Sequence, residues 1–134
     1  NKQIHPNALI DMKLQTSDQD NKDPDKFEKE TLKALNMPSE IVMRHRTPQF
    51  AHIFSSDAYS AGYYSYLWAD VITADAFSAF TEAGGPYDKK VAARLSKNIF
   101  SVGNTIDPEI GFRNFRGRNA ETKALMKERG FPVK

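Results

Sequence analysis

The feature that most constrains the fold of this chain is residues 59–83, a segment that is apolar almost all the way round when it is placed on an α-helix. A helix of that kind is buried on most sides in a folded protein. A chain of 134 residues has little mass with which to cover it, so we expect a covering segment that lies outside this chain. The large apolar side chains of the segment are Tyr63, Tyr64, Leu67, Trp68, Val71, Ile72, Phe77 and Phe80.

Short helices separated by polar or glycine-containing breaks are predicted for most of the remaining sequence. Aspartate followed by proline favours a helix start, because the carboxylate accepts hydrogen bonds from free amides and proline fits the first helical position. Residues 16–23 are predicted to form a loop and residues 41–54 an irregular segment, and we expect an all-α fold. The other predicted helices are residues 7–15, one from Asp23-Pro24 to Met37, one from Asp88 to Gly103, one from Asp107 to Gly117 and one from Asn119 to Gly130.

The composition excludes several kinds of chemistry. The chain has no cysteine, so disulfides, a thiolate nucleophile and a thiolate metal site are all excluded. It also has no apolar run of the roughly 18 residues that a membrane-spanning helix needs, and we expect no membrane partner. The lack of cysteine fits the cytoplasm and the periplasm equally well, and we expect the cytoplasm.

Charge is distributed unevenly along the sequence. Residues 17–30 hold six acidic side chains and three lysines, a net −3, whereas residues 94–134 hold nine basic and four acidic side chains, a net +5. A basic tail can bind nucleic acid. Because acidic residues are interspersed here and no aromatic-plus-basic motif occurs, we favour a solvated surface, or a face that docks on a more acidic part of the same protein. We expect no nucleic-acid partner.

The candidate site is a histidine followed by three tyrosines. On a continuous helix Tyr59, Tyr63 and Tyr66 fall at i, i+4 and i+7, which predicts three phenol hydroxyls on one stripe shortly after His52. Such hydroxyls can bind a peptide carbonyl or an oxyanion, or they can simply pack. We favour the functional interpretation for the tyrosines. For His52, a structural role and hydrogen bonding to a substrate carbonyl both remain open.

A self-contained zinc site is not predicted. The histidines are His5, His45 and His52, and no two of them have the short helical spacing of zinc ligands.

Three other groups of charged residues are interpreted as structural. Arg44 and Arg46 flank His45 and suggest surface or interdomain ion pairs, Asp70 follows the tyrosines, and the arginines around Gly117 suggest docking at a helix end.

The sequence resembles the thimet oligopeptidase and peptidyl-dipeptidase family of zinc metallopeptidases over nearly its whole length. It is most similar to the bacterial peptidyl-dipeptidase branch. The similarity rests on a Phe-x-His-hydrophobic-Phe pattern at residues 50–54, Tyr-x-Ala-Gly-Tyr-Tyr-Ser-Tyr-Leu-Trp at 59–68, Asp70, Asp75-Ala76-Phe77, residues 98–104, Phe-Arg-Gly-Arg at 115–118, Arg129-Gly130, Asp11-Met12 and residues 37–45.

The resemblance implies a mostly helical catalytic domain that cleaves short peptides in a deep channel, with dipeptides removed from free C-termini in the most similar branch. In this family a zinc-bound water attacks the scissile carbonyl, and a glutamate of a His-Glu-x-x-His helix is the general base. That motif is not found in residues 1–134. We therefore expect the chain to be the C-terminal segment of a peptidase catalytic domain. It would be inactive alone, with zinc and the zinc-binding helices supplied by the upstream part of the same protein and no metal held by this chain.

The resemblance also implies roles for individual residues. Tyr66 matches the tyrosine that donates to the tetrahedral oxyanion, and His52 matches a histidine that contacts the substrate backbone. Tyr59 matches a loop tyrosine that closes on substrate, and Tyr63 another tyrosine that lines the substrate site. Relatives carry glycines in the loop where this chain has Ser55, Ser56 and Ala58. Ser56 and the adjacent Asp57 are candidates to replace some of the substrate contacts of that loop.

Two other functions are consistent with parts of the sequence. The chain could be a non-enzymatic helical interaction module that keeps the fold without the chemistry, and a longer protein without His-Glu-x-x-His would favour that function. A basic nucleic-acid binder would lose affinity steeply with added salt. We rank the peptidase first, the interaction module second and the nucleic-acid binder third.

Overall fold

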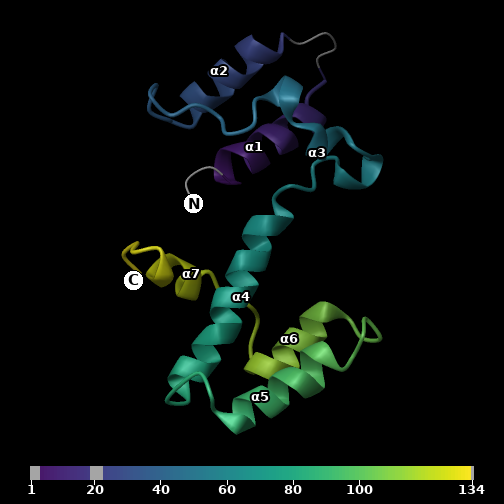
Figure 1. Ribbon diagram of the computed structural model, residues 1–134, viewed down its shortest axis with the longest axis vertical. Coiled ribbons are helices and arrows are strands. Elements are labelled where there is room, and N and C mark those ends of the chain that lie inside the picture. Colours follow the sequence, from purple (N-terminus) through teal and green to yellow (C-terminus); the bar gives the residue numbers. More distant parts are fainter. Residues whose placement is uncertain (1–3, 19–22, 134) are drawn as a thin grey trace. The chain divides into compact units, whose positions relative to one another are not determined.

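The computed structural model describes residues 4–18 and 23–133, with the backbone alone for Ile4 and His5. Within these residues all regular structure is helical, which confirms the expected all-α class (Figure 1). The predicted loop at residues 16–23 lies partly outside the described residues. The chain forms two compact units, Asn1–Leu67 and Trp68–Lys134.

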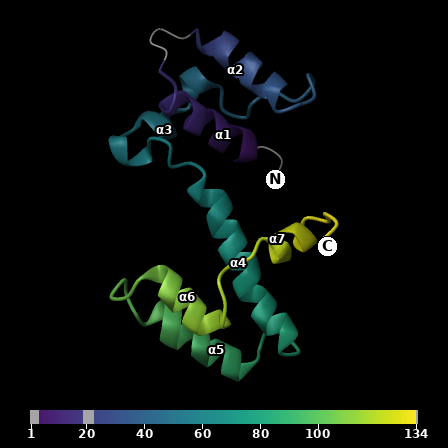
Figure 2. The same ribbon diagram turned by 180° about the vertical axis from the view of Figure 1, so that it is seen from behind.

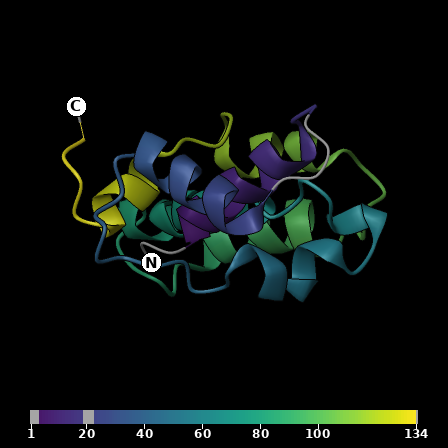
Figure 3. The same cartoon turned by 90° about the horizontal axis from the view of Figure 1, so that it is seen from above.

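The first unit is built from α1, α2 and a series of short helical turns. Asp23 starts α2 as predicted, because its carboxylate accepts from the amides of Asp25 and Lys26. Helices α1 and α2 lie side by side (Figures 1 and 3). The elements are α1 (Ile4–Gln15), α2 (Pro24–Ala34), η1 (Thr47–Gln49), α3 (Ala51–Phe54) and η2 (Asp57–Tyr59).

A buried glutamate joins α2 to the segment that leads to His52. Glu28 accepts hydrogen bonds from the Thr47 amide, at 3.1 Å, and from the Thr47 hydroxyl, at 3.3 Å. Both residues are buried, and the charge-assisted bonds therefore fix the start of η1 on α2. The prediction that residues 41–54 are irregular is wrong in its last part, since η1 and α3 are helical. The buried apolar side chains of this unit are Ala8, Ile10, Met43, Phe50 and Ile53.

The second unit packs three helices around a small apolar core. Helices α4, α5 and α6 lie together (Figure 2), and Ala79 of α4, Val91 of α5 and Phe115 of α6 form the centre of the core. Gly111 of α6 allows a close approach, since an added Cβ would lie 2.8 Å from the Asn98 carbonyl oxygen. The elements are α4 (Ser65–Glu82), whose first turn belongs to the first unit, α5 (Lys89–Leu95), a π-helical turn η3 (Ser96–Phe100), α6 (Pro108–Arg116) and α7 (Lys123–Glu128).

Three predicted helix starts are wrong. Helix α1 begins at Ile4, not at Asn7. Helix α4 begins at Ser65, not at Tyr59, because Ala61 has a φ of 54° and cannot continue a right-handed helix. Helix α7 begins at Lys123, not at Asn119. The residues that precede it stay outside the helix because their polar groups are bound elsewhere, as the Glu121 amide is by Asp75.

As expected for a chain of this mass, the described residues cover α4 only in part. Its buried residues are Val71, Ala74, Asp75 and Ala79. Three of its four aromatic residues are about half exposed: Tyr66 48%, Trp68 49% and Phe77 57%. The described residues therefore leave a wide apolar surface of α4 uncovered.

Candidate functional site

His52 lies on the short helix α3, and its ring is positioned by Phe50. The Phe50 side chain is 5% exposed and anchors the segment in the core of the first unit. Its ring stacks with that of His45, with centroids 5.1 Å apart, and with that of His52, with centroids 6.3 Å apart. Sequence reasoning quoted Phe50 only as part of a motif. Its buried position shows that it supports both imidazoles.

The three predicted tyrosines gather around His52. The ring centroids of Tyr59, Tyr63 and Tyr66 lie 4.9, 5.7 and 5.9 Å from that of His52. The predicted helical stripe does not bring them together, because Tyr59 belongs to η2, Tyr63 to a turn and Tyr66 to the first turn of α4. The fold of the loop places three separate elements around one imidazole instead.

The polar centre of this cluster is a hydrogen bond between His52 and Tyr66. The His52 Nε2 atom and the Tyr66 hydroxyl oxygen are 3.2 Å apart. If Nε2 carries the proton, it donates to the phenol oxygen and leaves the phenol hydrogen free for a third group. Both side chains line an open recess of about 390 Å³. Because half of Tyr66 is exposed there, its hydroxyl is accessible to a ligand. The recess is lined by His45, Gln49, Phe50, Ala51, His52, Tyr63 and Tyr66.

The other predicted site residues lie on the loop beside the recess. Ser56 lies between α3 and η2, and Asp57 is the first residue of η2; both are exposed, and neither lines the recess. Tyr59 touches the His52 ring from this loop and is 45% exposed. The structure thus brings Tyr59, Tyr63 and Tyr66 to His52, whereas Ser56 and Asp57 do not line the recess.

A larger hollow of about 930 Å³ runs along α2, but its chemistry differs from that of the recess. Its polar groups include Asp25, Glu28 and Arg46, and these are paired with one another. The carboxylates raise the pKa of Arg46, so the arginine is engaged in the ion pairs expected from the sequence. We therefore place the candidate site at His52 and not at the larger hollow.

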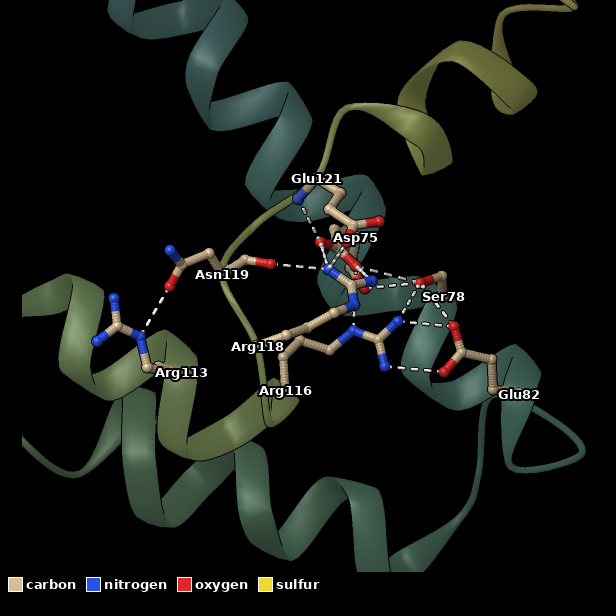
Figure 4. A network of polar contacts seen from close by, with 8 residues as sticks. All are labelled: Asp75, Ser78, Glu82, Arg113, Arg116, Arg118, Asn119 and Glu121. Carbon is tan, nitrogen blue, oxygen red and sulfur yellow. Dashed lines mark hydrogen bonds and ion pairs between the residues drawn. The ribbon is translucent and has the colours of Figure 1, made fainter. Parts of the chain in front are cut away.

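A second polar cluster, in the other unit, is centred on the fully buried Asp75 of α4 (Figure 4). Its carboxylate accepts from Arg116 at 3.0 Å, from Arg118 at 2.6 and 2.7 Å, and from the Glu121 amide at 2.7 Å. Arg116 also donates to Glu82. These contacts attach the end of α6 and the segment after it to α4.

The Asp75 carboxylate is held in its charged form. Burial alone would raise the pKa of Asp75, but hydrogen bonds from Arg118, the Glu121 amide and Arg116 outweigh it and leave the pKa below its ordinary value. Hydrogen bonds from Arg116 likewise lower the pKa of Glu82. Every acceptor position of Asp75 is engaged, so the cluster is structural. The arginines dock on carboxylates, where the sequence suggested helix carbonyls.

Asp70 is also engaged within the second unit. Its carboxylate accepts from Arg129 at 2.7 Å, which ties α4 to the end of α7. This ion pair confirms the structural interpretation of Asp70.

The described residues do not fit a zinc site. The imidazoles of His45 and His52 each stack on the Phe50 ring, and the side chain of His5 lies outside the described part. No group of three or more histidine, aspartate or glutamate side chains within residues 4–18 and 23–133 is arranged to hold a metal ion. No helix within residues 4–18 and 23–133 has the length and hydropathy of a membrane span.

Comparison with known proteins gives the family. The model of peptidase family M3 matches residues 4–131. The chain is 35% identical to dipeptidyl carboxypeptidase of Escherichia coli (strain K12) over 129 residues, 94% of this chain and 19% of that protein. It is 44% identical to oligopeptidase A of the same organism over 81 residues, 60% of this chain and 12% of the relative. The chain thus spans less than a fifth of these relatives, and it belongs to peptidase family M3.

Proposed function

We propose that this chain is the C-terminal segment of the catalytic domain of a peptidase, and that the recess at His52 holds the backbone of a peptide substrate. The observation that carries the proposal is the 3.2 Å contact between His52 Nε2 and the Tyr66 hydroxyl on the wall of an open recess. Membership of family M3 supports peptide hydrolysis by the whole protein.

Zinc would be held by the part of the protein outside this chain. Family M3 peptidases are generally zinc-dependent. Because the described residues do not fit a zinc site, we assign this chain no metal ligand and no role in supplying the attacking water. The chain alone would therefore be inactive, and its contribution would be to bind the substrate and to stabilise charge.

The proposed chemistry uses the donors of the recess. When a nucleophile adds to a peptide carbonyl, the carbonyl oxygen becomes an oxyanion. The Tyr66 hydroxyl would donate to that oxygen, and His52 would orient the hydroxyl through the contact at its oxygen. A donor that strengthens its bond as charge develops lowers the activation barrier, while it adds little to the binding of the ground state. Tyr59 and Tyr63 would flank the substrate from the loop and the turn.

We also propose that the whole protein releases dipeptides from free C-termini. Support comes from the relative named dipeptidyl carboxypeptidase, which matches 94% of this chain. Dipeptide release can be distinguished from internal cleavage with two peptides that differ only in having a free or an amidated C-terminus. Dipeptide release requires the free carboxylate, so we expect mass spectrometry to show dipeptide products from the free form alone. Equal internal cleavage of both forms would contradict this specificity and would leave the peptidase proposal intact.

The experiment that tests the role of Tyr66 is the Tyr66→Phe change in the full-length protein. It removes one hydroxyl and keeps the ring that packs against Tyr63. Loss of such a donor is expected to lower kcat about 10²–10³-fold with little change in KM. Tyr64→Phe, which removes an exposed hydroxyl outside the recess, is the matched control. An unchanged kcat would contradict the role. A full-length protein that binds peptides but cleaves none would favour the interaction module.

A further inference from the structure

We propose that Asp11 is a positioning residue, one that fixes the turn carrying Tyr63 and thereby sets where the Tyr66 hydroxyl lies against His52. The inference rests on the proposed function of Tyr66 and extends it to a residue far away in the sequence. Asp11 lies on α1, is fully buried and is not among the residues that line the recess. Its effect on the site must therefore pass through the backbone that it holds.

The contacts of Asp11 are two hydrogen bonds to one turn. Its Oδ1 accepts from the Ala61 amide at 3.2 Å, and its Oδ2 accepts from the Tyr63 amide at 3.0 Å. The turn lies between η2 and α4, so these amides are outside the regular hydrogen bonding of a helix. Amides left unpaired in a partly buried turn are costly, and a carboxylate that accepts from both is a strong, charge-assisted partner.

The turn needs such an anchor because its backbone is strained. Ala61 has a φ of 54°, a left-handed conformation that alanine rarely adopts. Conformations of this kind persist only where the surrounding structure holds them. The two bonds from Asp11 lie on either side of the next residue, Gly62, and so hold the turn at the point of strain. A neutral asparagine could accept only one of these amides and would turn its own amino group toward the other.

The position of this turn determines the geometry of the recess. Tyr63 carries one of the two anchored amides, and its ring contacts Phe50, His52 and Tyr66. The Tyr66 amide in turn donates to the Tyr63 carbonyl oxygen at 3.4 Å in the first turn of α4. A displaced Tyr63 would therefore carry the start of α4 with it. A misplacement of about 1 Å at a reacting group can cost about 10²-fold in rate.

The test is a double-mutant cycle of Asp11→Asn and Tyr66→Phe in the full-length protein. Asp11→Asn is expected to lower kcat about 10–100-fold with KM little changed. In the Tyr66→Phe background the further loss should fall to about threefold or less, because the hydroxyl that Asp11 positions is already gone. Asp23→Asn is the matched control: Asp23 also accepts two backbone amides, but at a helix cap outside the recess, where asparagine serves equally well.

A second measurement does not depend on activity. In hydrogen exchange the amides of Ala61 and Tyr63 are expected to exchange faster in Asp11→Asn, with the amides of α2 unchanged. If Asp11→Asn does not fold, Asp11→Asn/Ala61→Gly relieves the strain at the left-handed position and provides a folded protein for the same measurements. Unchanged exchange at both amides would overturn the proposal.

The cycle also separates this inference from the proposed function. Equal losses from Asp11→Asn in the wild-type and Tyr66→Phe backgrounds would show that Asp11 does not act through Tyr66, and would overturn the positioning role alone. A Tyr66→Phe enzyme with unchanged kcat would overturn the proposed function and, with it, the link from Asp11 to turnover.

Discussion

The two polar clusters of this chain are built in opposite ways. Around Asp75, one buried carboxylate accepts from two arginines and an amide, and every acceptor position is occupied. Around His52, the groups are aromatic side chains, and they meet in one hydrogen bond at an open recess. The Asp75 cluster holds α6 and the segment after it on α4, whereas the His52 cluster has a hydroxyl, that of Tyr66, that can bind a ligand.

The difference shows that a buried network of strong bonds does not by itself identify a functional site. Perturbed pKa values are a common guide to catalytic residues, and here they point to Asp75, Glu82 and their arginines. Structural ion-pair networks perturb pKa values as well. The recess at His52 is the better candidate because its donors are accessible and converge on one space. Changes at Asp75 are therefore expected to lower stability, and changes at His52 to lower activity.

The largest effect is expected from Asp75→Asn. The change removes the charge that Arg116 and Arg118 share, and breaking a buried ion pair by removing one partner costs about 3–5 kcal/mol. Urea unfolding of the full-length protein, followed by hydrogen exchange at the amides of α6, measures this loss. Activity per folded molecule should stay unchanged. Glu109→Gln, which breaks an exposed pair with Arg113, is the control and should cost less than about 1 kcal/mol.

Acid is expected to weaken the same cluster without a mutation. The pKa of Asp75 is lower in the folded chain than in the unfolded chain, so the folded state binds fewer protons in acid. The stabilisation is therefore complete above the unfolded-state pKa of about 3.9 and is lost as the pH falls through the folded-state value. Unfolding midpoints measured from pH 6 down to pH 2 should fall more steeply for the wild type than for Asp75→Asn. Parallel curves would contradict this assignment.

His52→Gln is expected to affect turnover more than stability. Glutamine keeps a hydrogen-bonding group but loses the ring that stacks on Phe50 and orients the Tyr66 hydroxyl. We expect kcat to fall about 10–100-fold, in the range of a single oriented hydrogen bond, and the unfolding midpoint to change little. His45→Gln is the matched change at the other imidazole that stacks on Phe50, and it should have the smaller effect on kcat. Equal effects of the two changes would contradict a special role for His52.

The smallest effect is expected from Asp70→Asn. The Asp70 side chain is 43% exposed, and ion pairs of that exposure contribute about 1 kcal/mol or less. The unfolding midpoint should shift slightly and kcat should not change. A loss of unfolding free energy as large as that of Asp75→Asn would show that Asp70 contributes more to the stability of the second unit than its exposure suggests.

Local signals in the sequence predicted most of the helices. Asp23, Asp88 and Asp107 were expected to start helices, and each accepts a hydrogen bond from an amide of the helix that follows it. Gly117 ends α6 in the left-handed conformation, as a helix-terminal glycine does. Such signals involve residues within one turn of each other, so they can be found without knowledge of the fold.

What the sequence did not predict depends on contacts between distant residues. The start of α4 is set by Ala61 and by Asp11, which lies fifty residues earlier in the chain. No local sequence pattern predicts the contact between these two residues. Asp75 was noticed only within a family motif, since its partners lie more than forty residues away. The grouping of tyrosines at His52 was expected for the wrong reason, a helical stripe. The loop fold that produces it becomes visible only in the structure.

The measurement that tests the central claim most directly compares a phosphinic peptide, whose tetrahedral oxyanion resembles that of the reaction, with the matching substrate. Both are measured on the full-length wild-type and Tyr66→Phe proteins. If Tyr66 binds the developing oxyanion, the inhibition constant of the phosphinic peptide should rise about 10²-fold, while the KM of the substrate stays nearly constant. Equal changes in the two constants, or no change in either, would contradict the account.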